Sequence, residues 1–177
     1  GVERLLKTLR QARFTHLVDR PHHYGLNIAV GGVDATPLEV AELYTTFARE
    51  GEHRPLTILR DEESERISQR LWTAGASWLV DQEMARRERP DLPWRSTRQA
   101  ASMSVPVHWK TGTSNNNHDA WSVGYAGDHT VAVWLGNLDH TPSRALVGAQ
   151  VAAPLMFDVL ESIMPPRVER AGEESHP

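Results

Sequence analysis

The sequence predicts an α+β domain in which helices pack against an antiparallel sheet. Three segments with strand character follow one another at residues 105–113, 119–126 and 130–135. The last two are joined by a hairpin turn. Segments with helical periodicity stand before and after this group. The predicted order is therefore three helices, three antiparallel strands and a closing helix.

The first segment, residues 2–13, predicts a short amphipathic helix. Its apolar side chains recur at helical spacing on one face, at Val2, Leu5, Leu6 and Leu9. Residues 15–24 contain Pro21 and three histidines, and we expect a loop there.

The second helix has a clear N-terminal signal. Thr36 can cap the first amides, Pro37 suits the first helical position, and Glu39 completes a capping box. Gly51 predicts the end of this helix. Its expected buried stripe consists of Val40, Leu43, Tyr44 and Phe47.

The pattern is weaker between this helix and the sheet. Residues 56–59 predict a short strand, and the acidic residues 61–65 are expected to be solvated. Residues 73–87 predict a third helix, and residues 89–103 predict an irregular surface loop with two prolines. The expected buried face of the third helix is Ala76, Leu79, Val80 and Met84.

The strand prediction rests on alternation and composition. Residues 119–126 alternate roughly by two, and residues 130–135 are rich in β-branched and aromatic side chains. Residues 127–129, Gly-Asp-His, supply the hairpin turn. Trp121 and Trp134 are expected to pack the sheet against helices, as large aromatic side chains in strands usually do.

Residues 146–164 predict the closing helix. Pro154 lies inside this segment and requires a kink or a late helix start. Residues 1–164 are therefore expected to form the folded part, and residues 165–177 a polar linker or tail. The expected buried face of the helix is Val147, Val151, Leu155, Val159 and Ile163.

Composition and charge narrow the functional classes. The formal net charge is −4 and no basic face stands out, which argues against nucleic-acid binding. The absence of cysteine excludes a disulfide framework, a thiol nucleophile and a cysteine-ligated zinc site. No His-x-x-x-His pattern lies on a predicted helix, so neither a metal nor a cofactor is expected. No run of about 18 apolar residues is present, so nothing in this sequence is expected to span a membrane.

The most informative motif for chemistry is Lys110-Thr111-Gly112-Thr113 at the end of a predicted strand. The Lys110 ammonium is a point charge for a carboxylate, and the threonine hydroxyls add donors. Gly112 lets a ligand backbone come close, and an exposed strand edge can pair with a peptide. The Thr113 amide can donate to an oxyanion. These four residues alone also fit a solvated lysine beside threonines that favour strands. They do not form a phosphate loop, because that motif places its glycines before the lysine.

Four segments resemble the third-motif strand and the following hairpin of penicillin-binding proteins: residues 109–114, 119–121, 123–125 and 131–136. Residues 31–44 resemble the segment that precedes this strand in class A members, and residues 153–155 resemble their closing helix. The resemblance covers residues 25–164. The lack of a long insertion before the strand and the sequence of residues 139–142 favour the penicillin-binding protein 1C type.

The resemblance implies the C-terminal part of the transpeptidase domain of a bifunctional peptidoglycan synthase, with an incomplete β-lactamase/transpeptidase-like fold. Such enzymes cross-link stem peptides that end in D-alanyl-D-alanine through a serine acyl-enzyme, and β-lactams trap the same serine. By this resemblance, Lys110 and the hydroxyls of Thr111 and Thr113 hold the carboxylate of the substrate or the β-lactam. Gly112 allows close approach of the acyl group, and the Thr113 amide is one of two oxyanion donors.

Two of the three family motifs are absent. No serine has a lysine three places on, and Ser114-Asn115-Asn116 follows the third motif too closely to serve as Ser-x-Asn. The family also often has arginine or lysine where His118 stands, so a charge role at that position is in doubt. The resemblance places the nucleophile and its base upstream of Gly1, and a glycosyltransferase domain and a membrane anchor further upstream. It implies a location at the periplasmic face of the inner membrane, and a chain that is inactive alone.

Two other function classes remain open. One is a non-catalytic module that binds peptidoglycan peptides, and the other is a β-lactamase or D,D-carboxypeptidase relative. The presence of Ser-x-x-Lys and Ser-x-Asn upstream separates the enzymes from the module, and residues 31–44 favour the transpeptidase over the hydrolases. A domain cut within its core exposes apolar surface, so we expect a missing upstream part or a self-associated copy to cover it.

Overall fold

The computed structural model describes residues 1–58, 68–85 and 93–164. The helices are α1 (Val2–Gln11), α2 (Pro21–Tyr24), α3 (Pro37–Ala48), α4 (Ala74–Met84), α5 (Trp94–Ser102) and α6 (Ala153–Ile163). The 3-10 turns are η1 (Gly25–Val30) and η2 (Asn115–Asn117), and η3 (Gly148–Ala152) is a π-helical turn. The strands are β1 (Glu52–His53), β2 (Gln69–Arg70), β3 (His108–Thr113), β4 (Asp119–Ala126) and β5 (His129–Gly136). This combination confirms the predicted α+β class.

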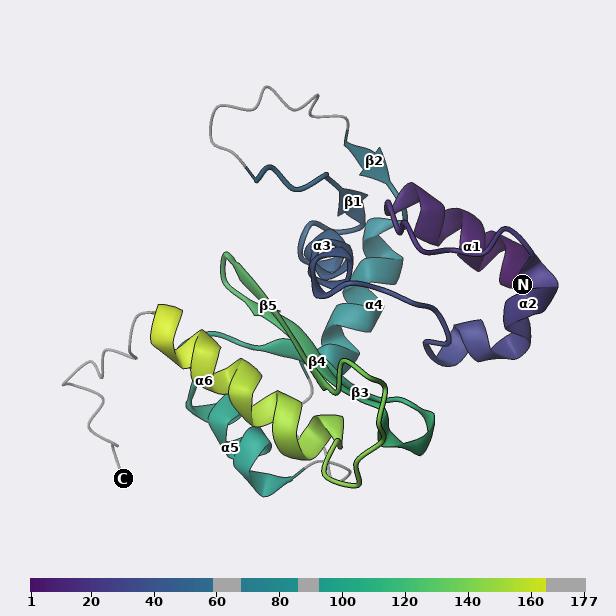
Figure 1. The fold of residues 1–177 in the computed structure, drawn as a ribbon. Coiled ribbons are helices and arrows are strands. Elements are labelled where there is room, and N and C mark those ends of the chain that lie inside the picture. Colours follow the sequence, from purple (N-terminus) through teal and green to yellow (C-terminus); the bar gives the residue numbers. More distant parts are fainter. Residues whose placement is uncertain (59–67, 86–92, 165–177) are drawn as a thin grey trace, which may run out of the picture.

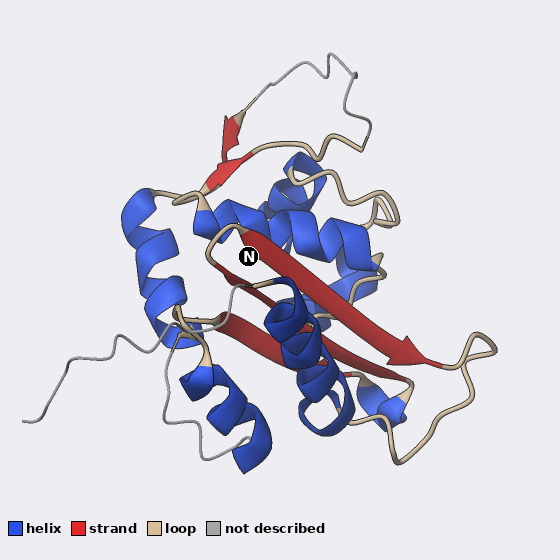
Figure 2. Ribbon diagram, turned by 90° about the vertical axis from the view of Figure 1, so that its left-hand side faces the viewer, coloured by secondary structure: helices blue, strands red, loops and turns tan. Residues whose placement is uncertain are grey.

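A three-stranded antiparallel sheet lies at the centre, with α5 and α6 on one side and α3 and α4 on the other (Figure 1). The strand order is β3-β4-β5, and the strands lie side by side in Figure 2. The predicted strands are confirmed, with small changes at their ends. β3 begins at His108 rather than at residue 105, since Pro106 has no amide to donate to a ladder. Gly127 takes a φ of 53° in the hairpin turn, which suits glycine.

One face of the sheet packs against α6. Trp109 meets Phe157 edge to face with ring centroids 4.9 Å apart, and the Ser122 hydroxyl lies 3.2 Å from the Met156 sulfur. The predicted late start at Pro154 is confirmed, because α6 begins at Ala153 after η3. The predicted buried face is wrong: Leu155 is 42% exposed and Ile163 is 45% exposed. The side chains that are buried instead are Ala153, Met156, Phe157 and Leu160. The π-helical turn and the late start change the rotation of the helix, and the bulkier neighbouring stripe faces the sheet.

The other face of the sheet carries α3 and α4. The predicted capping box is confirmed, because the Glu39 amide donates to the Thr36 hydroxyl over 3.2 Å and the Thr36 amide donates to Glu39 Oε2 over 2.7 Å. The face predicted for α4 is wrong, with the exception of Met84. Ser77 is buried instead, because its small side chain meets the backbone near Gly51. The predicted residues Ala76, Leu79 and Val80 are exposed, as is the neighbouring Trp78.

A second, smaller core lies under α1. It joins buried side chains of α1 to α2 and η1, and its members are Leu6, Leu9, Ala12, Phe14, Tyr24 and Ile28. The predicted helix is confirmed, but the expected loop at residues 15–24 contains α2. Pro21 suits the first turn of this helix, and Tyr24 is buried so that its hydroxyl accepts the Val18 amide over 2.5 Å.

Two further predictions are wrong. Residues 56–58 have no regular structure, and the short strand lies earlier, at β1, where it pairs with β2. The loop expected over residues 89–103 contains α5. This segment has few apolar residues, but Ala100 packs against the main core and Gln99 Nε2 donates to Asp158 Oδ1 of α6 over 2.9 Å. The predictions for residues 59, 61–65, 86–87, 89–92 and 165–177 lie outside the described residues.

The side chain of His53 is a buried polar link between α3 and β1. It is 2% exposed, with Nε2 3.0 Å from Glu42 Oε1 and Nδ1 3.2 Å from the Thr46 hydroxyl. A neutral ring fits the contact at Nδ1, which accepts the Thr46 hydroxyl proton, whereas Nε2 and Glu42 Oε1 lie close together without the geometry of a hydrogen bond. Burial lowers the pKa of His53 below its ordinary value, against the opposing attraction of Glu42.

This pKa shift predicts that stability falls on acidification. The unfolded chain binds a proton at His53 at a pH where the folded chain does not, so the free energy of unfolding decreases as the pH falls below about 6.5. Urea unfolding at several pH values between 8 and 5 measures how steeply the free energy of unfolding changes with pH. His53→Gln cannot titrate at this position and is expected to show a shallower slope. Equal slopes for the two proteins would contradict the assignment.

Candidate active site

The motif at residues 110–113 lies on an edge strand. β3 pairs only with β4 among the described residues, so no described strand lies along its other edge. Lys110 lies opposite Val123 and faces the side of α3, whereas Thr113 lies opposite the buried Ala120 and faces the side of α6. The four motif residues are therefore brought together at one strand end, as expected, but their side chains point to two faces of the sheet.

A groove of about 380 Å³ opens beside the motif. Residues 110–114 form one wall, and apolar side chains of α1, η1 and α3 form the other, among them Leu9, Ile28 and Leu43. The Lys110 ammonium donates to the Thr111 carbonyl oxygen over 2.5 Å. A positive charge therefore stands at the rim of an apolar groove, where an anionic group on an otherwise apolar ligand would be favoured.

Tyr44 of α3 also lines this groove. Burial raises the pKa of Tyr44 to about 12. The phenol is therefore neutral at physiological pH and contributes a polar but uncharged group to the wall.

The Thr113 hydroxyl has a backbone partner. The Gly148 amide donates to Thr113 Oγ1 over 3.0 Å. A hydroxyl has one donor and two acceptor positions, so this bond leaves the hydroxyl hydrogen for another partner. The following loop is closed by Ser114 and Asp119, since the Asp119 amide donates to the Ser114 hydroxyl over 2.7 Å.

Asp119 has the structural role that its place after the motif suggests. One carboxylate oxygen accepts the indole N–H of Trp134 over 2.9 Å, and the Asp119 carbonyl accepts the Ser114 amide over 3.0 Å. Trp134 in turn lies opposite Trp121 in the sheet. Asp119 therefore ties the loop after β3 to β5.

The family model of the penicillin-binding protein transpeptidase domain matches residues 22–161. The chain belongs to this family. Among curated relatives, the transpeptidase chain is 33% identical to penicillin-binding protein 1C of Escherichia coli over 134 residues, which are 76% of this chain and 16% of that protein. It is 29% identical to penicillin-binding protein 1B of Vibrio cholerae over 153 residues, or 81% of this chain and 19% of that protein. The chain thus spans less than one fifth of the length of either relative, and these matches confirm the class A assignment.

Solved structures agree on the fold. Penicillin-binding protein 1A from Haemophilus influenzae superposes with a TM-score of 0.67 at 20% identity, covering 95% of this chain and 32% of that one. The transpeptidase domain of Burkholderia pseudomallei penicillin-binding protein 3 gives a TM-score of 0.54 at 21% identity, covering 78% of this chain and 46% of that one.

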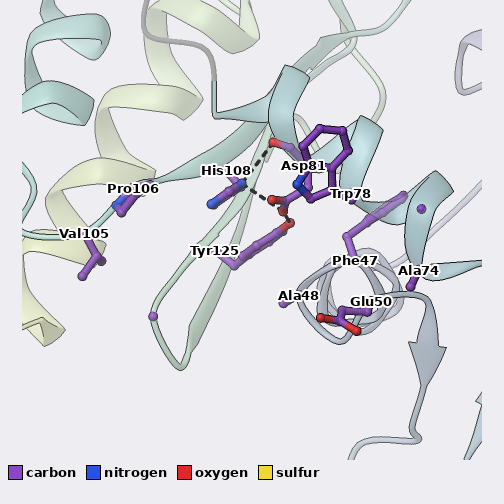
Figure 3. A pocket seen from close by; sticks show the side chains of 12 residues that line it. Phe47, Ala48, Glu50, Ala74, Trp78, Asp81, Val105, Pro106, His108 and Tyr125 are labelled. Carbon is purple, nitrogen blue, oxygen red and sulfur yellow. Dashed lines mark hydrogen bonds and ion pairs between the residues drawn. The ribbon is translucent and has the colours of Figure 1, made fainter.

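The transpeptidase fold carries a second cavity at the other end of β3. It measures about 670 Å³ and is lined by side chains of α3, α4 and the sheet (Figure 3). His108 Nδ1 lies 2.9 Å from Asp81 Oδ1, and the Tyr125 hydroxyl donates to the same oxygen, as the dashed lines show. The rings of His108 and Tyr125 stack with centroids 4.9 Å apart. Burial, followed by the hydrogen bond to Asp81, raises the pKa of Tyr125.

Sequence reasoning did not identify this cluster. Asp81 is separated from His108 and Tyr125 by 27 and 44 residues, and no local motif joins them. The polar residue within the apolar run of α4 is the one signal that could have indicated Asp81. Within residues 1–58, 68–85 and 93–164, no group of three metal-binding side chains gathers. No helix in that part of the transpeptidase chain is long and apolar enough to cross a membrane.

Asp81 is expected to anchor α4 to the sheet. Asp81→Ala removes the carboxylate that accepts the Tyr125 hydroxyl and leaves His108 only its 3.1 Å contact with the main-chain carbonyl of residue 81, and it is expected to lower the free energy of unfolding by about 1–3 kcal/mol. Chemical denaturation measures this change. Gln82→Ala, at the neighbouring exposed position of α4, is the control and is expected to stay within about 0.5 kcal/mol of the parent. A similar small effect for Asp81→Ala would contradict the anchoring role.

Proposed function

We propose that this chain supplies the carboxylate-binding strand of a serine-type D,D-transpeptidase that cross-links peptidoglycan stem peptides and binds penicillin. The observation that supports the proposal most directly is the position of residues 110–113 on the open edge of β3, beside an apolar groove. The Lys110 ammonium lies on the α3 side of this edge and the hydroxyls of Thr111 and Thr113 lie on its α6 side, so polar groups flank an edge that no described strand pairs with and that suits an extended peptide ending in a carboxylate.

Each motif residue has a role in this proposal. The Lys110 ammonium and the hydroxyls of Thr111 and Thr113 bind the terminal carboxylate of D-alanyl-D-alanine or of a β-lactam. Gly112 is exposed, and a Cβ there would meet only Trp121 Cβ at an ordinary 3.5 Å, so the missing side chain serves the ligand rather than the packing. The Thr113 amide donates to the developing oxyanion, an interaction worth about 10²–10³ in rate.

The rest of the machinery is proposed to lie upstream of Gly1. This part holds the nucleophilic serine, its lysine base and the Ser-x-Asn motif, and it precedes the C-terminal portion formed by residues 1–164. A glycosyltransferase domain and a membrane anchor stand further upstream and hold the protein at the periplasmic face of the inner membrane. We propose that the complete protein is of the penicillin-binding protein 1C type, which the 33% identity to that protein of Escherichia coli supports.

Covalent labelling by penicillin tests the proposal. A chain extended upstream through the serine motifs is expected to gain one benzylpenicillin adduct on an upstream serine, measured by intact mass. Lys110→Ala removes a charge-assisted bond to the carboxylate and is expected to slow acylation about 10- to 100-fold. Lys7→Ala, which removes an exposed charge on α1, is the control and is expected to label at the parent rate.

The outcomes separate the competing functions. A stable adduct that depends on Lys110 supports the transpeptidase. An adduct that is hydrolysed within seconds indicates a β-lactamase or carboxypeptidase relative. The absence of an adduct indicates a non-catalytic module that binds peptidoglycan peptides.

The exposed apolar side chains of α4 support the proposal that residues 1–164 form only part of a domain. Trp78 is 60% exposed and Leu79 is 62% exposed, side by side on one helix. We expect the upstream part of the domain to cover this face, or a second copy to do so when that part is missing. By light scattering, the 19.9 kDa chain alone is expected to exceed its monomer mass. The extended chain and Trp78→Ser are expected to shift toward monomer, and a monodisperse monomer of the unsubstituted short chain would contradict this expectation.

A further inference from the structure

We infer that Gly148, in the turn before α6, is a positioning residue that orients the Thr113 hydroxyl toward the ligand carboxylate. This inference rests on the proposed function, because it concerns the same carboxylate site. It adds a residue 35 positions away from Thr113 whose contribution comes entirely from its backbone.

The backbone of Gly148 lies directly against the strands that carry the motif. A Cβ at this position would stand 2.2 Å from the Gly112 carbonyl oxygen and 2.6 Å from the Trp121 carbonyl oxygen. Both neighbours are backbone atoms of the sheet and cannot rotate away. Gly148 is buried, so only a residue without a side chain allows the turn to support the end of β3 at this distance.

The contact between the turn and Thr113 is directional. The Gly148 amide donates to Thr113 Oγ1 over 3.0 Å. Turning the Thr113 side chain to another rotamer would leave this buried amide without its acceptor, which is costly. The bond therefore fixes the position of the oxygen, and it fills an acceptor site so that the hydroxyl hydrogen is available for an anion.

Two further hydrogen bonds hold the segment before this turn. Asn117 Nδ2 donates to the Leu146 carbonyl oxygen over 3.0 Å, and the Asn117 carbonyl accepts the Ser143 amide over 3.0 Å. Asn117 belongs to the loop that follows the motif. The turn and the motif are thus joined both directly, at Thr113, and through this loop. Gly148 also begins the π-helical turn η3, a rare geometry that is frequent at functional sites.

The experiment compares two ligands on the complete transpeptidase protein. Acylation rate constants are measured with benzylpenicillin and with its methyl ester, which lacks the charged carboxylate. Gly148→Ala and Asn117→Ala are each expected to lower the benzylpenicillin-to-ester rate ratio, Gly148→Ala by about tenfold. Asn137→Ala is the matched control. It removes an equivalent bond, Asn137 Nδ2 to the Thr141 carbonyl at 2.6 Å, elsewhere in the same connection, and is expected to leave the ratio unchanged.

The ratio separates positioning from simple support of the fold. A lower ratio for Gly148→Ala and Asn117→Ala, but not for Asn137→Ala, supports the inference. An equal loss with both ligands, or an unchanged ratio, overturns it. If Gly148→Ala does not fold, Asn117→Ala decides between these results by the same ratio. Failure of the unsubstituted protein to react with benzylpenicillin would refute the proposed function, and the inference with it, before any substitution is compared.

Discussion

The packing of β4 between two strands and between two helical layers is the constraint on which the rest of the structure depends. Gly124 of this strand has no room for a side chain, because a Cβ there would stand 2.7 Å from Trp109 Cβ and 2.8 Å from the His108 carbonyl oxygen. β3 is therefore fixed closely to β4 along one edge. No described strand pairs with its other edge alongside residues 110–113.

Both helical layers contribute to the site that this arrangement leaves at the edge. On the side of α3, side chains of α3 and α1 form the apolar groove that faces Lys110. The layer with α6 reaches the motif through the preceding turn, where Gly148 meets Thr113. At the other end of β3, Asp81 joins α4 to His108. The motif strand is thus anchored at both ends, which holds its polar groups in place before a ligand arrives.

Local signals in the sequence were sufficient for some elements. The capping box at Thr36 and the alternating residues of β4 depend only on residues that are close in sequence, and the structure has both where they were predicted. The buried faces of α4 and α6 were predicted wrongly because both helices are apolar on more than one side. Tertiary contacts at Ser77 and Phe157 select the buried stripe there. α5 was missed because it has few apolar residues, and its contacts with the rest of the fold, Ala100 against the core and Gln99 to Asp158 of α6, come from distant parts of the chain.

The candidate site also has one part that the sequence predicted and one part that it did not. Lys110 to Thr113 are consecutive, so a strand prediction was enough to place them together. Gly148 and Asp81 reach the same strand from distant parts of the chain, and a lone glycine or aspartate carries no signal of that contact.

A crystal structure of the complete domain with benzylpenicillin bound to its serine tests the central claim most directly. The account predicts the ligand carboxylate within about 2.7–3.2 Å of the Thr111 or Thr113 hydroxyl, on the open edge of β3. A carboxylate bound away from residues 110–113 would contradict it.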